Sequence, residues 1–488
     1  MNAKSSNIKI ISSVLWKALE RVGTQGIQFI VQILLARLLL PEDYGLIALI
    51  TIFITFANVF VQRGFNNALI QKKKADDLDF SSVFYVSLIV AVIIYLILFL
   101  AAPLLAVFYD ENLITPIIRV LALSLFIGAF NSIQYAYVAR NMMFKKLFLS
   151  SLIAVILSGI VSIILAYVGF GVWSLVTQQL LSQVVILVVL WYTINWRPKL
   201  IFSLTRIKEL FKYGSNLLAA SILHTLYGNL RNLIVGSVYN SAMLGFFSKG
   251  SQLPLTIINP IDSSLQAVMF PTLSSYQDDR DKVKSIVKRY IKLSSFVIFP
   301  LTVGLAVVAE PLVKILLTEV WLPIVPFLQI FCISFASMPF HSANLQTINA
   351  LGRSDIFFRL EIIKKILGVF IIFLGMPFGV FGLAWGSVGS SFIAVFINSY
   401  PNGKLINYKC LEQVKDIFHN LLIALLMGFS VYLIGFIPFP LGLLLATQIA
   451  TGIFAYILLS LIFKNESFNY IFDLLKNILK SKNKRVNE

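Results

Sequence analysis

The sequence predicts a polytopic all-α membrane protein, and three observations support this prediction. Of the 488 residues, 58% are hydrophobic and only 13% are charged, whereas soluble domains carry about 25% charged residues. The mean hydropathy is +0.86. Apolar stretches long enough to cross a bilayer, which takes about 20 helical residues, recur along the whole chain. Together these features exclude an ordinary soluble globular protein.

Fourteen such stretches can be placed, and an even number of spans puts both ends of the chain on the same side of the membrane. No short apolar stretch with a small-residue cleavage site precedes the first one, so we expect that span to be retained and not removed as a signal peptide. The predicted spans are 13–39, 45–70, 81–106, 114–139, 147–168, 172–194, 213–239, 245–271, 293–309, 324–348, 360–376, 381–400, 416–437 and 441–463.

The positions of Lys and Arg between the spans predict the orientation. Most of the 40 Lys and Arg residues fall in the amino terminus, in every second connection and in the tail. The other connections carry Lys314 among acids such as Glu42 and Asp43. Basic residues stay on the cytoplasmic side, so we predict a cytoplasmic-membrane protein with both termini in the cytoplasm. Topology then explains the net charge of +18, and nucleic-acid binding need not be invoked.

The first predicted span has a polar face. At about 100° per residue, an arc of about 140° holds Lys17, Glu20, Arg21, Thr24, Gln25, Gln28 and Gln32. Charges at membrane depth are costly against lipid and normally face a bundle interior or a water-filled cavity. Alternatively, Lys17 and Arg21 snorkel from the inner end of the helix while Glu20 neutralises them. Snorkelling does not explain the glutamines further along the same face.

The end of this span and the beginning of the next carry a recognisable pattern. Its parts are LARLL at 35–39, PEDYGL at 41–46 and NALIQ at 67–71. The pattern resembles the amino-terminal signature of polysaccharide transporters, the Wzx-type lipid-linked oligosaccharide flippases of the MOP superfamily, which also contains MATE exporters and lipid II flippases. It is most similar to the exopolysaccharide, lipopolysaccharide and teichuronic acid export branch. The resemblance implies two pseudo-symmetric six-helix lobes arranged as a V, with two added carboxy-terminal helices in some branches.

An internal repeat points in the same direction. Residues 44–46 align with 244–246, and Arg140 with the turn at 169–171 corresponds to Arg353 with the turn at 379–382. Both halves begin on the cytoplasmic side, so the repeat is parallel, and substrates of such transporters lie near the midplane between the halves. We therefore predict an N-lobe over 1–199, a cytoplasmic amphipathic linker over 200–212, a C-lobe over 213–400, a cytoplasmic loop with two further spans over 401–463, and a basic amphipathic cytoplasmic tail over 464–488.

Further polar residues mark the spans that would face the first across a cavity. Arg231 lies near the middle of the seventh predicted span, beside Asn232, where snorkelling is difficult. The eighth span carries Lys249 and Asp262. Its two prolines, Pro254 and Pro260, break the helical hydrogen-bond ladder and predict either a hinge or a static kink. The second span adds Arg63.

These residues would line a cationic cavity rich in amides. The predicted substrate-binding residues are Lys17, Arg21, Arg63, Arg231, Lys249, Asn232, Gln25 and Gln28. Guanidinium binds phosphate bidentately, and side-chain amides match sugar hydroxyls. The sequence therefore favours alternating-access export of a polyprenyl-diphosphate-linked oligosaccharide, such as an O-antigen, exopolysaccharide or capsule repeat unit. Expected partners besides this lipid are anionic membrane lipids and other polysaccharide-assembly membrane proteins. The acids Glu20 and Asp262 are candidates for ion coupling or for salt bridges.

The sequence leaves other classes of function open. A MATE-like drug or cation antiporter would share the architecture, but a cationic substrate calls for unpaired carboxylates in the cavity. A membrane glycosyltransferase or ligase is disfavoured because the outer connections are short and no Ser/His/Asp cluster, HExxH or Walker A motif accompanies the spans. A scaffold in a polysaccharide-synthesis complex is the third alternative. Neither Cys332 nor Cys410 has the neighbours of a metal site or a nucleophile. Together with the lack of catalytic motifs, this leads us to expect no enzyme activity, no catalytic residues, no metal and no cofactor.

Overall fold

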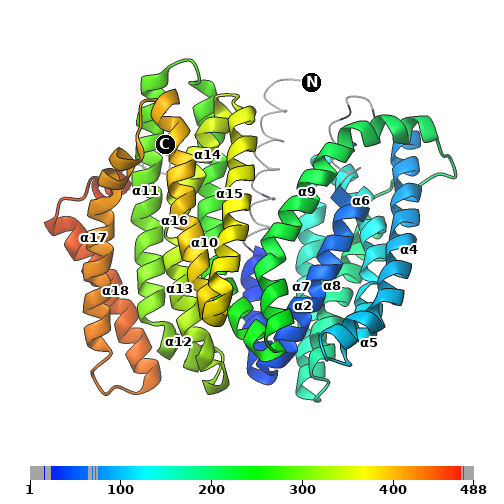
Figure 1. Ribbon diagram of the computed structural model, residues 1–488, viewed down its shortest axis with the longest axis horizontal. Coiled ribbons are helices and arrows are strands. Elements are labelled where there is room, and N and C mark those ends of the chain that lie inside the picture. Colours follow the sequence, from blue (N-terminus) through cyan, green and yellow to red (C-terminus); the bar gives the residue numbers. More distant parts are fainter. Residues whose placement is uncertain are drawn as a thin grey trace, which may run out of the picture. The chain divides into compact units, whose positions relative to one another are not determined.

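Almost all of the described chain is helical in the computed structural model (Figure 1). The structure describes residues 23–63 and 75–473, together with Trp16, Leu69, Lys72 and Lys476. Helices satisfy all backbone hydrogen bonds within one segment, which a chain in a bilayer requires. The chain divides into two compact units, Met1–Ser248 and Lys249–Glu488.

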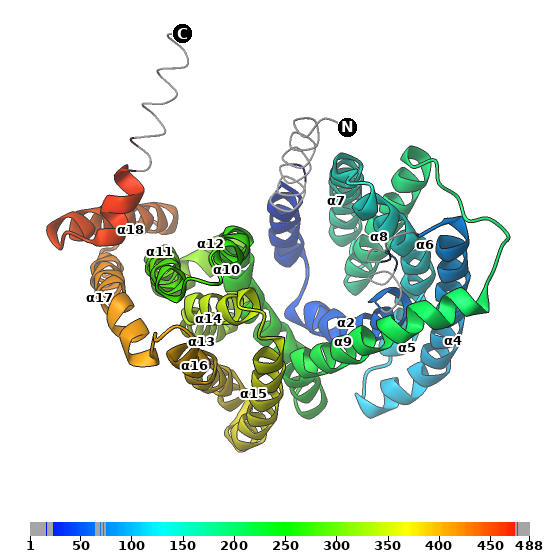
Figure 2. The same ribbon diagram turned by 90° about the horizontal axis from the view of Figure 1, so that it is seen from above.

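The first unit begins, in its described part, with a helix over 23–38. Its further elements are α2 (Pro41–Asn58), the π-helical turn η1 (Val59–Arg63), α4 (Asp77–Phe108), α5 (Ile114–Leu121), α6 (Ser124–Arg140), α7 (Phe144–Tyr167), α8 (Val172–Thr193), α9 (Leu204–Val238) and the start of α10 (Ser241–Ser275). The helix α7 packs along α8, and α4 packs against α5 and α6. The long helix α9 contacts α2, η1 and α4, and its course past them is visible from above in Figure 2.

The second unit contains the rest of α10 and the helices that follow it. These are α11 (Arg280–Val307), α12 (Ala309–Leu316), η2 (Glu319–Ile324), α13 (Val325–Phe335), α14 (Met338–Ala350), α15 (Ser354–Gly375), η3 (Met376–Phe378), α16 (Gly379–Leu405), α17 (Cys410–Ile434) and α18 (Leu441–Ile462). Helix α11 packs against α17, α13 and α14, and α15 packs against α16. A core of fully buried side chains, including Leu273, Ile291, Ala343 and Ala424, joins α10, α11, α14 and α17.

Ten segments of the described chain are long and apolar enough to cross a membrane, as judged by length and composition. One of them, Ser354–Leu405, contains both α15 and α16, which are separate predicted spans. The seventh and eighth predicted spans are α9 and α10, helices of 35 residues each whose polar side chains lower their mean hydropathy. The prediction of an all-helical multi-pass protein is confirmed, whereas the count of fourteen spans stays a prediction.

The two halves of the chain repeat the same helix breaks. The fourth predicted span is interrupted at 122–123, between α5 and α6, and the tenth at 336–337, between α13 and α14. The turns that follow these spans also agree, because Met142 after α6 and Gly352 after α14 have positive φ angles of 54° and 71°. The repeat seen in the sequence is therefore present in the helices. The exact limits of the two predicted lobes stay a prediction.

Two glycines allow α2 and α10 to cross with their backbones in contact, within the first unit. A Cβ atom on Gly45 would overlap the carbonyl group of Ser241, and a Cβ atom on Gly245 would overlap the carbonyl oxygen of Pro41. No side chain fits between the two helices at this crossing. Tyr44-Gly45-Leu46 and Leu244-Gly245-Phe246 are the segments that align in the internal repeat.

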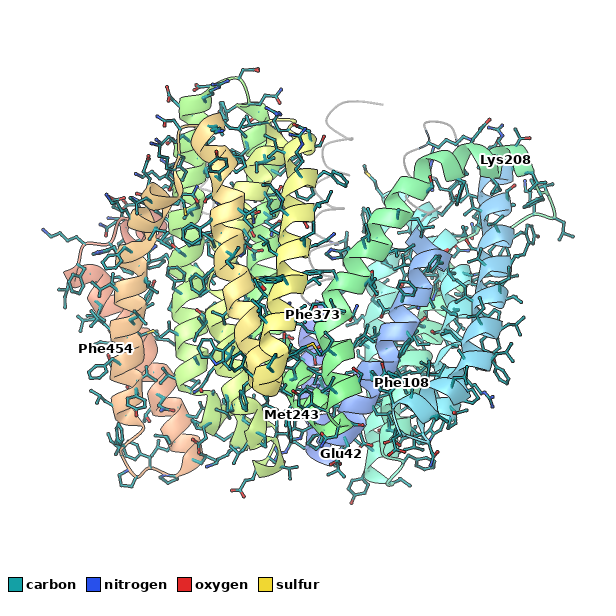
Figure 3. All side chains as sticks on the ribbon, viewed as in Figure 1. Glu42, Phe108, Lys208, Met243, Phe373 and Phe454 are labelled. Carbon is teal, nitrogen blue, oxygen red and sulfur yellow. The ribbon has the colours of Figure 1, made fainter. Side chains whose placement is uncertain are left out.

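One basic and one acidic connection of the first unit lie at opposite ends of its helices. Lys208, in the predicted cytoplasmic linker, lies at one end, and Glu42 and Phe108 lie at the other (Figure 3). The linker is part of α9, which runs from Leu204 to Val238. The hydroxyl of Ser203 accepts a hydrogen bond from the backbone N–H of Arg206 at 3.4 Å and caps the helix. The amphipathic segment and the seventh predicted span are thus one continuous helix.

Candidate functional site

The helix over 23–38 carries the glutamines of the first predicted span. Gln25 is exposed and Gln28 is half-buried. Gln32 has a packing role, because its amide nitrogen donates to the side-chain oxygen of Gln178 on α8 at 3.1 Å. The backbone carbonyl of Gln32 also accepts a hydrogen bond from the Tyr44 hydroxyl at 3.4 Å. The candidates Lys17, Glu20 and Arg21 lie outside the described residues.

The end of α2 forms a ladder of amides. The Asn58 amide nitrogen donates to the carbonyl of Ile54 at 3.1 Å, and the Gln62 amide nitrogen donates to the side-chain oxygen of Asn58 at 2.9 Å. Gly128 of α6 makes room for this pair, since a Cβ atom there would lie 2.5 Å from the Gln62 nitrogen. Gln62 itself belongs to the π-helical turn Val59–Arg63, a geometry that is frequent at functional sites. The backbone of Arg63 belongs to this turn, and its side chain lies outside the described part of the chain.

Helix α9 positions Arg231 and Asn232, which are both half-buried. Arg231 lies seven residues before the end of α9 at Val238, about 10 Å along the helix. A Cβ atom on Gly236, in the same stretch, would lie 2.9 Å from a methyl group of Leu49, so this part of α9 packs beside α2. Arg231 therefore belongs to the same unit as Gln25 and Gln28.

Helix α10 carries the candidates of the second unit. Lys249 and Asp262 are both buried, with 6% and 3% of their surfaces exposed. Thirteen residues of continuous helix separate them, which is about 20 Å along the axis. This separation excludes an ion pair between the two. Lys249 adjoins Gly250, where a Cβ atom would lie 2.6 Å from the Cβ atom of Phe327, so α10 packs closely on α13 there.

Asp262 belongs to a polar network between α10 and α14. The Ser342 hydroxyl donates to its two carboxylate oxygens at 2.8 and 2.9 Å. The Gln266 amide nitrogen also donates to Asp262, at 2.6 Å. The Gln346 amide nitrogen donates in turn to Gln266 at 2.8 Å. None of the ion pairs among the described residues includes Asp262. Neutral donors therefore hold this buried carboxylate in place.

Ser342 and Gln346 belong to the Asp262 network although the sequence did not predict them there. They lie four residues apart on α14 and so share one helix face. That spacing was a usable signal for a polar face, although it does not say which acid the face would meet. Gln266 was visible as a polar residue four positions after Asp262.

The two predicted hinge prolines lie inside α10. The helix continues through Pro254, Pro260 and also Pro271. Hydroxyl groups of Ser263 and Ser264 donate to the carbonyl of Pro260 at 3.2 and 2.6 Å. Hydrogen bonds of this kind often bend helices. The hinge itself stays a prediction.

Three named bacterial proteins are similar in sequence to this chain. The succinoglycan biosynthesis transport protein ExoT of Rhizobium meliloti is 24% identical, over 75% of this chain and 73% of that protein. The teichuronic acid biosynthesis protein TuaB of Bacillus subtilis is 24% identical, over 72% and 73%. The lipopolysaccharide biosynthesis protein WzxC of Escherichia coli is 23% identical, over 75% of each chain. All three designations belong to the production or transport of polysaccharides.

The fold is similar to solved structures of membrane transporters. The lipid II flippase MurJ in an inward closed conformation matches with a TM-score of 0.77 at 16% identity, covering 92% of this chain and 98% of that one. An inward-facing MATE-family multidrug resistance transporter of the MOP superfamily matches with a TM-score of 0.60 at 16% identity, covering 80% and 98%. At such low identity these matches establish the fold alone.

The sequence also matches a protein family over more than half of its length. Residues 34–326 fit the family described as polysaccharide biosynthesis protein. The match includes the 35–39 and 41–46 motifs and extends through α9 and α10. The predicted resemblance is therefore confirmed, and the chain belongs to the polysaccharide biosynthesis protein family.

Proposed function

We propose that this protein is a flippase that moves a polyprenyl-diphosphate-linked oligosaccharide from the cytoplasmic to the outer leaflet. The observation that carries the proposal is that a chain of the polysaccharide biosynthesis protein family has a transporter fold. The designation of ExoT as a transport protein supports it. The cargo would be a repeat unit of an O-antigen, exopolysaccharide or capsule, and the protein would act as a transporter and not as an enzyme.

The chemistry of the candidate residues suits such a cargo. Arg231 can form two parallel hydrogen bonds to a phosphate. Asn232, Gln25 and Gln28 can exchange hydrogen bonds with sugar hydroxyls. Lys249 would add positive charge within α10. The remaining proposed cations are Lys17, Arg21 and Arg63. Together they would line a cavity that alternates between inner and outer access.

The two candidate acids differ in what supports a coupling role. The hydrogen bonds that Asp262 accepts from Ser342 and Gln266 favour a fixed position within the second unit. Glu20 lies outside the described residues. An inside-negative potential favours outward movement of an anionic headgroup by about 2.3 kcal/mol per charge per 100 mV. We keep Glu20 and Asp262 as coupling candidates and Pro254 with Pro260 as candidate hinges.

A cation antiporter is the second candidate function. The similarity of the fold to a MATE-family transporter favours it. A cationic substrate would need an accessible carboxylate, and Asp262 is 3% exposed and already accepts two neutral donors. An anionic cargo therefore fits the described residues better. Glycosyl transfer, ligation and a scaffold role in polysaccharide assembly have no feature of the described chain in their favour.

Substitution of Arg231 tests the proposal. In cells that depend on this protein, we expect Arg231→Ala to lower surface polysaccharide about tenfold and to raise lipid-linked precursor in the cytoplasmic leaflet. The loss of a charge-assisted hydrogen bond, worth roughly 1.5 kcal/mol or more, gives this magnitude. Arg231→Lys keeps the charge without the bidentate geometry, and we expect an intermediate effect.

The matched control is Arg359→Ala, which removes an exposed arginine at the start of α15. It should leave both pools unchanged. Protein level and membrane insertion are measured for all variants. Unchanged pools in a normally inserted Arg231→Ala protein would contradict the assignment of Arg231. If deletion of the whole protein leaves the distribution of lipid-linked precursor between the two leaflets unchanged, the proposed flippase function is contradicted.

A further inference from the structure

A pocket of about 310 Å³ lies between α11 and the short helical segment over 466–473 that follows α18. Its size is at the lower end of the range for small-molecule sites. The polar residues that line it are Ser285, Lys288, Arg289, Lys292, Glu466, Ser467 and Tyr470. Three of these are cationic, and all of them belong to the second unit. No candidate residue of the transport site lies among them.

The two lysines are held by acids of unequal exposure. Lys288 pairs with Asp416 of α17 at 2.9 Å, and Asp416 also accepts a hydrogen bond from the Tyr408 hydroxyl at 2.8 Å. The side chain of Asp416 is only 13% exposed, so it anchors Lys288 from behind the pocket lining. Lys292 contacts Asp416 at 3.7 Å and Glu466 at 2.7 Å. The side chain of Glu466 is 81% exposed and can turn outward into water.

The third cation is positioned by an aromatic ring. The guanidinium of Arg289 lies over the ring of Tyr470, 5.2 Å from its centre. Within the described chain, no carboxylate lies within ion-pair distance of Arg289. This cation–π contact positions the guanidinium, and its N–H groups can bind a planar or tetrahedral anion. The pocket thus holds a cation that the acids of its own walls do not neutralise.

Glu466 acts as an internal anion in this pocket. Its hydrogen bond with Lys292 lowers the pKa of the Glu466 carboxyl below its usual value, so the group is charged at neutral pH. One carboxylate oxygen therefore occupies a position beside Lys292 that suits a negatively charged oxygen. The carboxylate of Glu466 pairs with Lys292, while Arg289 contacts the ring of Tyr470. An external anion with several oxygens could contact Lys292 and Arg289 together.

The pocket lies where α11 changes from charged to apolar. Lys292 is the last charged residue of α11, and the helix continues from Leu293 to Val307 without charge. On the other wall, the ring of Phe468 lies 6.4 Å from that of Phe296, and Phe472 is 58% exposed. Cations at such a boundary sit at the level of lipid headgroups, beside apolar surface for acyl chains.

We propose that this pocket binds a phosphate-bearing anionic headgroup, whose phosphate displaces Glu466 from Lys292 and binds the guanidinium of Arg289. The ligand carries a phosphate diester or monoester, and its source is a membrane phospholipid or a soluble phosphate ester. On binding, Glu466 turns to water, and the segment over 466–473 is held by the shared ligand and not by its own carboxylate. The site is independent of the identity of any transported glycan.

Binding measurements on the full-length purified protein test the proposal. The probes are phosphatidylglycerol in phosphatidylcholine nanodiscs, counted by native mass spectrometry, and soluble glycerol 1-phosphate as competitor. We expect Arg289→Gln to weaken phosphatidylglycerol binding about fivefold, as loss of one cation near a membrane surface implies. Glu466→Gln removes the competing internal anion, and we expect it to strengthen binding by about the same factor. Arg359→Gln, the control, should change nothing.

Comparing phosphatidylglycerol with glycerol 1-phosphate distinguishes the two sources of the phosphate. If glycerol 1-phosphate displaces the lipid, the pocket accepts soluble esters, and if it does not, the ligand is a phospholipid. The gain expected for Glu466→Gln cannot result from misfolding. Equal losses in Arg289→Gln and Arg359→Gln would indicate diffuse surface charge and overturn the proposal. Weaker binding by Glu466→Gln would also overturn it, because Glu466 would then be a supporting contact and not a competitor.

Discussion

Two aspartates are buried in the described part of the chain, and they are stabilised in different ways. Asp79, which is fully buried, forms an ion pair with Lys72 at 2.6 Å and completes the cap at the start of α4. Asp262 accepts hydrogen bonds from the neutral side chains of Ser342 and Gln266. The first arrangement joins a connection to the start of α4, and the second ties α10 to α14.

Asp262 offers a direct test of that second arrangement. Asp262→Ala leaves the buried hydroxyl of Ser342 without its acceptor, which costs about 1–3 kcal/mol, whereas the Gln266 amide nitrogen keeps the Ser342 oxygen at 3.0 Å. Asp262→Asn keeps one side-chain oxygen, so we expect a smaller loss. The measurement is the melting temperature of the purified protein in detergent. We expect it to be highest for the wild type, lower for Asp262→Asn and lowest for Asp262→Ala. Equal melting temperatures would mean that the network does not stabilise the second unit.

At the scale of elements, α2 and α10 cross within the first unit with their backbones in contact. Gly45 and Gly245 permit this contact because neither has a side chain. We expect Gly45→Ala and Gly245→Ala each to lower thermal stability, because the added methyl group forces the two backbones apart, and overpacking costs about 1–3 kcal/mol or more. Gly228→Ala in α9 is the matched control, since nothing lies within 4 Å of the position that its Cβ atom would take. Alanine there should be neutral or stabilising by up to about 1 kcal/mol. A destabilised control with unaffected crossing variants would contradict this account.

Apolar length predicted most helices to within a few residues, but it could not predict where helices break or join. No proline or glycine lies at or beside the interruption at 122–123 to announce it, whereas Pro339, in the first turn of α14, follows the interruption at 336–337 and was a usable signal. Conversely, the linker and the seventh span form one helix although Gly214, Ser215 and Asn216 follow Lys212, because no proline interrupts the helix that Ser203 caps. The contacts of Asp262 depend on how α14 approaches α10, which residue spacing along either helix does not determine.

At the scale of the whole molecule, orientation in the membrane is the property that the charge pattern predicts and labelling can test. In a Cys410→Ser background, Cys332 is 1% exposed and should not react. An impermeant maleimide added to intact cells should label Glu42→Cys, and it should label Lys208→Cys only after permeabilisation, because basic connections stay inside. Both replaced residues are exposed. The reverse labelling pattern would invert the topology.

The crossing of α2 and α10 has a consequence for the origin of the chain. Gly45 meets Ser241 while Gly245 meets Pro41, so each helix presents to the other the positions that the internal repeat makes equivalent. Reciprocal contacts of this kind define the isologous interface of a two-fold homodimer. Gene duplication and fusion of a smaller protein that paired with its own copy would leave this arrangement in one polypeptide. The glycine crossing would then be the oldest subunit interface in the molecule, now intramolecular.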